Sequence, residues 1–176
     1  MQPTLVGVDH FDDHNYGIEG CIKQIISLLD MAQREVLILS GTMNSDLYEK
    51  PSVIQSFERA LKRGITIKIL VGKSFEINNN QILDLFRKYS NTKSSLRIFH
   101  FPRSDDTPTP HFMVVDKSHT RIEYLHNENC SLEDISAEAI GVYDYRQATM
   151  LVEAFNRNWD SSGSPFPEFV IDDNID

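Results

Sequence analysis

Alternation between helix-like and strand-like segments in the first half of the chain is the feature that most restricts its fold. Apolar residues recur with helical spacing in residues 17–32, and a short apolar run follows at 36–40. A second helical segment begins at Pro51 and stops at Gly64, and a β-branched run follows at 66–71. This order predicts strands joined by crossover helices in one sheet.

The second half of the chain adds a hairpin and a closing helix to this pattern. The other predicted elements are a loop at 41–51, a helix after Asn80, strands at 96–101 and 139–143, and a helix at 145–159 with Asp144 as its N-cap. Residues 132–137 fit neither a helix nor a strand clearly. Together the elements predict an α/β fold in which a mixed β-sheet is sandwiched by helices.

We expect a single domain, because the sequence shows no internal repeat and no linker. The domain spans residues 17–160, between an irregular N-terminus at 1–16 and a flexible acidic tail at 161–176. Phe155 and Trp159 lie on the apolar face of the last helix, where we predict that they are core residues rather than a ligand cage.

Charge argues against a nucleic-acid partner without excluding one. The 176 residues carry a formal net charge of −9, and the basic residues form no stripe of the kind that binds a phosphate backbone. A local basic patch or a partner subunit could still reverse the sign of the field at one face.

Composition also bears on compartment and cofactors. No apolar run approaches the roughly 20 residues of a membrane-spanning helix, and no basic-then-apolar leader opens the chain. The two cysteines, Cys21 and Cys130, lie far apart and outside any Cys-x-x-Cys pair, which is typical of reduced thiols in a cytoplasm. His10 and His14 bring metal-ligand side chains into the N-terminus, but nothing there fixes their geometry. We therefore predict a cytoplasmic domain without a metal or a cofactor.

The most informative polar residues lie in the hairpin at 109–126. His111 begins an apolar strand that ends at Asp116, and a second strand carries Arg121, Glu123 and His126. Because side chains alternate between the faces of a strand, Arg121 and Glu123 share one face. His126 lies an odd number of residues from Glu123, so it joins that face only if the strand bulges or ends between them.

These side-chain types suit phosphate-ester chemistry. A neutral His111 can attack phosphorus, Glu123 can orient its imidazole, and His126 can protonate the leaving oxygen. The competing interpretation of His111 is a strand-edge histidine that hydrogen-bonds to the backbone. Arg121 is either a bidentate phosphate clamp or a surface arginine paired with a carboxylate. For Asp116 we favour a structural role, in which the carboxylate accepts backbone N–H groups of the turn.

The order of elements resembles one half of the phospholipase D superfamily. The segments VLILSG (36–41) and VIQSFERALKRGITIKILVG (53–72) resemble the opening strand, helix and strand of that family. The segment AIGVYDYRQATMLVEAFNRNW (139–159) resembles its closing strand and helix, and the likeness covers about residues 17–160.

The family signature is His-x-Lys, four residues and Asp, followed by Gly-Ser-x-Asn. Aligned on Asp116, the family histidine falls on Thr109 and the family lysine on His111. The Gly-Ser-x-Asn region falls on residues 123–126. The resemblance therefore implies that the phosphohistidine nucleophile is missing, since a threonine hydroxyl is no replacement for an imidazole. The other register, with His111 as the histidine, puts Met113 and Ser118 at the lysine and aspartate positions.

Members of the family place two such halves face to face. The resemblance thus implies a homodimer that brings two copies of the hairpin together. We expect a binding, sensing or scaffold module that holds a phosphate-bearing ligand through residues such as Thr109 and Arg121. The alternatives are an active phosphodiesterase or nuclease that uses His111, Glu123 and His126, and a dimerisation subunit of a larger assembly.

Overall fold

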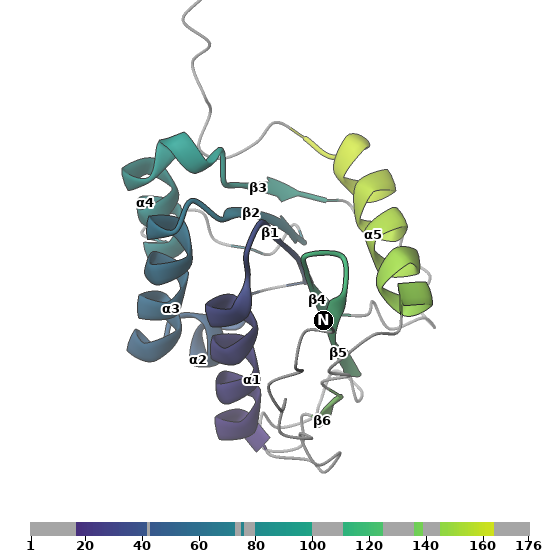
Figure 1. Cartoon of the computed structure of the whole chain (residues 1–176), viewed down its shortest axis with the longest axis horizontal. Coiled ribbons are helices and arrows are strands. Elements are labelled where there is room, and N and C mark those ends of the chain that lie inside the picture. Colours follow the sequence, from purple (N-terminus) through teal and green to yellow (C-terminus); the bar gives the residue numbers. More distant parts are fainter. Residues whose placement is uncertain are drawn as a thin grey trace, which may run out of the picture.

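A six-stranded β-sheet with helices on both faces forms the centre of the computed structural model (Figure 1). The structure describes residues 17–41, 43–72, 75, 80–99, 111–124, 136–138 and 145–163. The described helices are α1 (Gly17–Met31), α2 (Ser45–Tyr48), α3 (Pro51–Lys62), α4 (Gln81–Lys88), the 3₁₀ turn η1 (Ser90–Thr92) and α5 (Tyr145–Asp160). The described strands are β1 (Glu35–Ser40), β2 (Thr66–Val71), β3 (Ser95–Ile98), β4 (His111–Val115), β5 (His119–Tyr124) and β6 (Ser136–Glu138).

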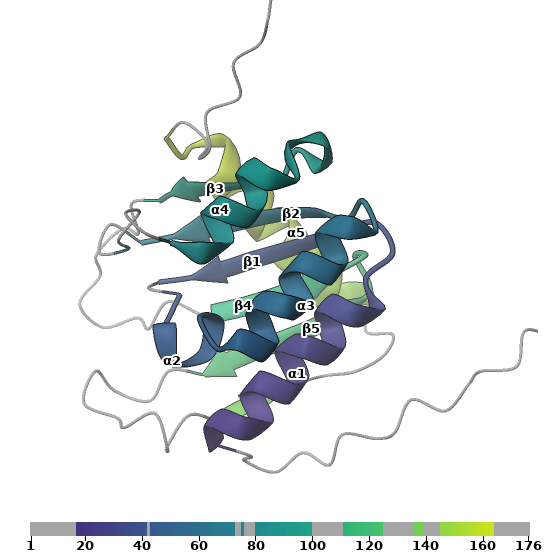
Figure 2. The same ribbon diagram turned by 90° about the vertical axis from the view of Figure 1, so that its left-hand side faces the viewer.

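The sheet is mixed, with the strand order β3-β2-β1-β4-β5-β6. Strands β1, β2 and β3 are parallel, and β4, β5 and β6 continue the sheet in antiparallel pairs. Helices α1, α3 and α4 cover one face and α5 covers the other (Figures 1 and 2). The predicted α/β fold with a mixed sheet between helices is therefore confirmed.

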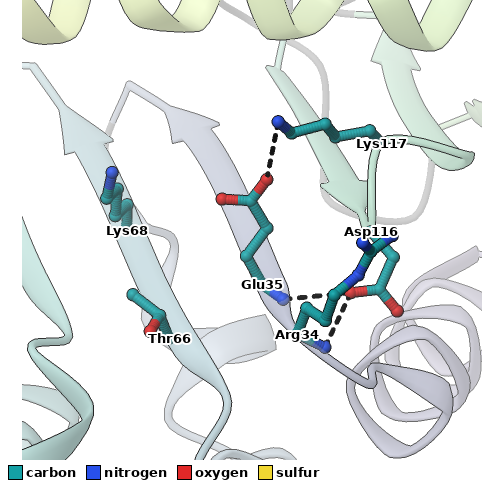
Figure 3. A pocket seen from close by; sticks show the side chains of 6 residues that line it. All are labelled: Arg34, Glu35, Thr66, Lys68, Asp116 and Lys117. Atoms are coloured by element: carbon teal, nitrogen blue, oxygen red, sulfur yellow. Dashed lines mark hydrogen bonds and ion pairs between the residues drawn. The ribbon is translucent and has the colours of Figure 1, made fainter.

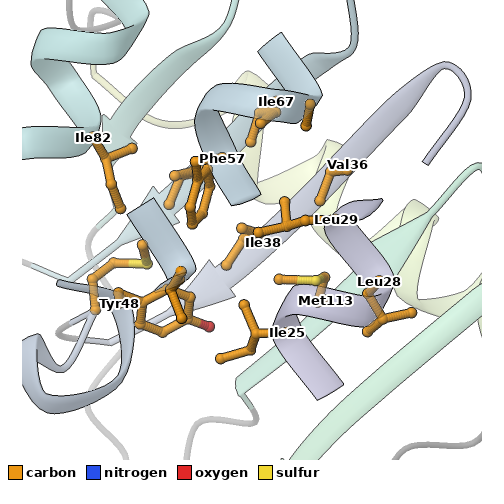
Figure 4. Packing of buried hydrophobic residues seen from close by; sticks show 14 of the residues in the cluster. Ile25, Leu28, Leu29, Val36, Ile38, Tyr48, Phe57, Ile67, Ile82 and Met113 are labelled. Atoms are coloured by element: carbon orange, nitrogen blue, oxygen red, sulfur yellow. The ribbon is translucent and has the colours of Figure 1, made fainter. Parts of the chain in front are cut away.

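Side chains of β1 alternate between two apolar layers. Val36 and Ile38 point into the larger layer beneath α1 and α3, whereas Leu37 and Leu39 point into the layer beneath α5. Figure 4 shows the larger layer, where Phe57 of α3 packs over the sheet beside Ile38. On the α5 side, Phe155 and Trp159 stack with their ring centroids 5.5 Å apart, which confirms both as core residues.

Local signals account for the ends of several elements. The Asn80 side chain accepts hydrogen bonds from the N–H groups of Ile82 and Leu83, both at 3.1 Å, and so starts α4 as predicted. Pro51 occupies the first turn of α3, and Gly64 follows that helix with a φ of +82°.

Some element predictions were wrong or lie outside the described residues. The predicted loop at 41–51 contains the short helix α2, which Asn44 caps by accepting a 2.9 Å hydrogen bond from the N–H of Asp46. Strand β3 ends at Ile98 although the pattern predicted a longer strand. The unassigned segment around residue 136 contributes β6, while the strand predicted at 139–143 and the cap Asp144 fall outside the described residues. The domain bounds at 17 and 160 stay a prediction.

No helix within the described ranges is long and apolar enough to cross a bilayer.

Candidate functional site

The hairpin of β4 and β5 places three of the predicted site residues on one face of the sheet. His111 lies opposite Glu123, and Met113 lies opposite Arg121. Because Met113 belongs to the apolar layer beneath α1, the side chains of His111, Arg121 and Glu123 also face that layer. The predicted residues Thr109 and His126 lie outside the described residues.

Arg121 and Glu123 form a buried ion pair. Their side chains are 1% and 6% exposed, and Arg121 Nη1 lies 3.0 Å from Glu123 Oε2. Arg121 Nε donates to Gln24 Oε1 of α1 at 3.2 Å. Burial opposes the guanidinium charge, but the oxygens of Tyr48 and Glu123 keep the pKa of Arg121 above its ordinary value. Arg121 is thus paired with a carboxylate, but it is a core residue and not the surface arginine that one interpretation expected.

One donor of Arg121 has no partner among the described residues. Nη2 is buried and makes no hydrogen bond to any residue in the described part of the chain. An unsatisfied buried donor costs about 1–3 kcal/mol, so an acceptor that reached this atom would be favoured.

His111 uses one ring nitrogen to hold the end of β1. Its Nε2 accepts a 3.1 Å hydrogen bond from the N–H of Gly41, the residue that follows β1. Burial lowers the pKa of His111, against the opposing effect of Glu123, so the ring is neutral and its proton is on Nδ1. The approach is close, because a Cβ atom at position 41 would lie 3.1 Å from Nε2. This contact is a hydrogen bond between the His111 side chain and the backbone, which is what the competing interpretation of His111 predicted.

Within the described residues, Glu123 forms no hydrogen bond with the imidazole of His111 and so does not orient it. Its carboxylate accepts from Arg121, and Gly41 supplies the hydrogen bond of His111. His111 and Glu123 are therefore neighbours without forming the histidine–carboxylate couple that general-base chemistry uses. Their catalytic roles stay a prediction.

The Asp116 carboxylate accepts hydrogen bonds from backbone N–H groups outside its own turn. Its two carboxylate oxygens accept the N–H groups of Gln33, Arg34 and Glu35 at 2.8, 2.8 and 3.0 Å. These groups lead into β1, whereas the prediction placed the donors in the turn of Asp116 itself. Asp116 and Lys117 both have positive φ, as in the tight turns that suit twisted hairpins.

Sequence reasoning missed the residues that complete the cluster. Gln24 is a buried polar residue on α1, and its spacing from Cys21 and Leu28 places it on the apolar stripe. That position was a usable signal, because a buried glutamine needs a partner. Burial also raises the pKa of the Cys21 thiol, which neighbours this cluster on α1. Within the described ranges no group of three or more potential ligands could hold a metal ion, and His10 and His14 lie outside those ranges.

Comparison with protein families gives one match, described as "Domain of unknown function (DUF7931)", over residues 18–169. The chain belongs to this family. No curated protein sequence matches this DUF7931 domain.

Solved structures with a phospholipase-D-like fold resemble the DUF7931 domain. Nuc, a phospholipase D family member from Salmonella typhimurium, has a TM-score of 0.53 at 15% identity and matches 79% of this chain and 86% of its own. NucT from Helicobacter pylori has a TM-score of 0.54 at 15% identity, with 82% and 91% covered. These similarities show the fold, and the expected phospholipase-D-like architecture is confirmed.

A third similar structure is TrmBL2, an archaeal chromatin protein with a novel mode of DNA binding. Its TM-score is 0.57 at 18% identity, over 84% of this chain. The DUF7931 chain spans about half of TrmBL2, since the match covers 51% of that protein.

Proposed function

We propose that this chain is a non-catalytic phospholipase-D-like module that acts by binding and does not hydrolyse phosphodiesters. The alignment with the family signature supports this, because Thr109 stands where the nucleophilic histidine is expected and His111 stands at the lysine position. A rewired enzyme would have to use His111 instead.

The hydrogen bond from Gly41 to His111 is the observation that carries the proposal. Nucleophilic attack on phosphorus needs a free imidazole lone pair, and the Nε2 lone pair accepts the Gly41 N–H at 3.1 Å. The other nitrogen carries the proton. Burial lowers the pKa of His111, so the ring is also a poor source of a proton at neutral pH. Glu123, the expected partner of the histidine, is held by Arg121.

Hydrolysis of bis-p-nitrophenyl phosphate tests the proposal directly. We expect no turnover above the buffer rate, with or without EDTA, for the wild-type chain. His119→Ala is the matched control, because His119 lies in the same hairpin. Within the described residues its side chain hydrogen-bonds only to the neighbouring Ser118. Turnover that His111→Ala abolishes, but that Thr109→Ala and His119→Ala retain, would establish the rival phosphodiesterase.

A phosphate-bearing ligand remains part of the proposed function. The buried, unpartnered Nη2 of Arg121 supports it, since a phosphate oxygen is a suitable acceptor for a guanidinium. In this proposal Thr109 and His126 supply further contacts from the adjoining segments. Nucleic acid is a less favourable ligand for a chain of net charge −9.

We also propose that the module is a homodimer in the cytoplasm. Pairing of two halves is what resemblance to the phospholipase D superfamily implies. The structural match covers 86% of the Nuc chain and 91% of the NucT chain. The widely separated cysteines support a reducing compartment.

A further inference from the structure

A pocket of about 420 Å³ lies at the start of β1 (Figure 3). The His111 cluster, which consists of His111, Arg121 and Glu123, lies toward the other end of that strand, where His111 accepts from Gly41. Glu35 and Thr66 are the first residues of β1 and β2, whereas Gly41 follows the last residue of β1. Lys117 borders the pocket from the turn between β4 and β5. The six lining residues are Arg34, Glu35, Thr66, Lys68, Asp116 and Lys117.

Two cations at this pocket have no carboxylate partner in the described residues. Lys68 is half-buried on β2, between β1 and β3, and its ammonium lies 5.6 Å from the centroid of the Trp159 ring. Arg34 is exposed just before β1, and neither side chain forms an ion pair within the described ranges. An anion beside Lys68 would therefore supply a counter-charge that the described residues do not.

The two carboxylates of the pocket neutralise its three cations only in part. The Asp116 oxygens already accept three backbone N–H groups, and this acid serves to hold the turn. Within the described residues Glu35 forms an ion pair with Lys117, and the distance of 3.8 Å is long for a charged hydrogen bond. Three basic and two acidic side chains leave a positive balance inside a chain whose net charge is −9. A concave wall with a net positive charge attracts anionic ligands.

We propose that this pocket binds a small phosphate-bearing molecule, at a site separate from the His111 cluster. Its volume lies within the range of small-ligand sites, which is about 300–1,000 Å³. Lys68 and Lys117 would act as point charges on opposite sides of the anion. Arg34 would supply a planar guanidinium that matches two phosphate oxygens.

Titration with inorganic pyrophosphate, followed by proton–nitrogen correlation spectra, tests the site. We expect saturable shifts of the backbone amides of Glu35, Thr66 and Lys117. Lys117→Gln and Lys68→Met should each weaken binding about two- to fivefold, as expected for loss of one partly exposed charge contact. Lys117 is exposed, so its substitution leaves the core intact and provides a test even if Lys68→Met fails to fold.

Two further variants separate a built site from general charge. Lys62→Gln is the matched control, because Lys62 is an exposed lysine of α3 on the other face of the sheet, and it should leave affinity unchanged. Glu35→Gln removes a negative charge from the wall and should tighten binding. An equal loss in Lys62→Gln, weaker binding in Glu35→Gln, or the absence of saturable shifts would overturn the proposal. Shifts confined to Gly41 and Arg121 would also overturn it, and would assign the anion to the hairpin instead.

Discussion

At the scale of single residues, the alternation of the hairpin predicted which side chains share a face but not what they do there. His111 and Glu123 are opposite one another as the two-residue period implies. Gln24, which accepts a hydrogen bond from Arg121, lies 97 residues from it in the chain, and Gly41, which donates to His111, lies 70 residues from the histidine. Such contacts depend on how α1 and β1 pack against the hairpin, and no local pattern in the sequence carries that information.

The buried pair of Arg121 and Glu123 makes a residue-scale prediction. Glu123→Gln should lower the free energy of unfolding by about 3–5 kcal/mol, because it leaves the guanidinium buried without its carboxylate. Adding Arg121→Met should recover much of that loss, since the double variant removes both charges. Urea denaturation measures each value.

Asp84→Asn provides the reference for an exposed pair. Asp84 and Arg87 are 69% and 54% exposed at 2.7 Å, so this change should cost less than about 1 kcal/mol. If Glu123→Gln is as mild as Asp84→Asn, Glu123 does not compensate the charge of Arg121.

At the scale of elements, most helices and strands follow from periodicity and end signals. Strand β2 coincides with the predicted run at 66–71, and α3 begins at the predicted Pro51. Helix α2 was missed because four residues are too few to show a period, and only the cap Asn44 marks it. The position of Asp116 in a turn was predictable, but its binding to the start of β1 was not, because β1 precedes it by 81 residues.

The attachment of the hairpin turn to β1 makes an element-scale prediction. Asp116→Ala should destabilise the fold by about 2–4 kcal/mol, because three backbone donors lose a charged acceptor. Asp116→Asn should cost less, since an amide retains one acceptor oxygen and asparagine tolerates the positive φ of this position. The midpoints of urea unfolding compare the two variants.

Lys117→Gln is the control for this turn, because the Lys117 side chain is exposed and its contact with Glu35 is long. If Asp116→Ala unfolds at the same urea concentration as the wild type, the prediction is contradicted, because water then replaces the carboxylate without a loss of stability.

At the scale of the whole molecule, the predicted layers are present. The alternation of helices and strands in the first half specified the parallel strands β1, β2 and β3, and the hairpin supplied antiparallel neighbours. The pocket at the start of β1 could not be predicted, because its wall combines residues around 34, 66 and 117. Three segments that are far apart in sequence meet there only after the sheet has formed.

Assembly state is the prediction that belongs to this scale. We expect light scattering coupled to size exclusion to give twice the chain mass at micromolar concentration, as the proposed pairing of two phospholipase-D-like halves requires. The dimer should persist from low to high salt, because two chains of net charge −9 repel at a distance and must associate through apolar contacts. A monomer at every concentration and salt would contradict the homodimer.

Strand β4 is fastened to β1 beyond both ends of their ladder, by His111 at one end and by Asp116 at the other. A slip of two residues between these strands would keep every apolar side chain on its proper face, so burial alone does not forbid it. Such a slip would break the hydrogen bonds of both His111 and Asp116 at once. These two polar residues thus select one register between β1 and β4, the pair at which the sheet changes from parallel to antiparallel.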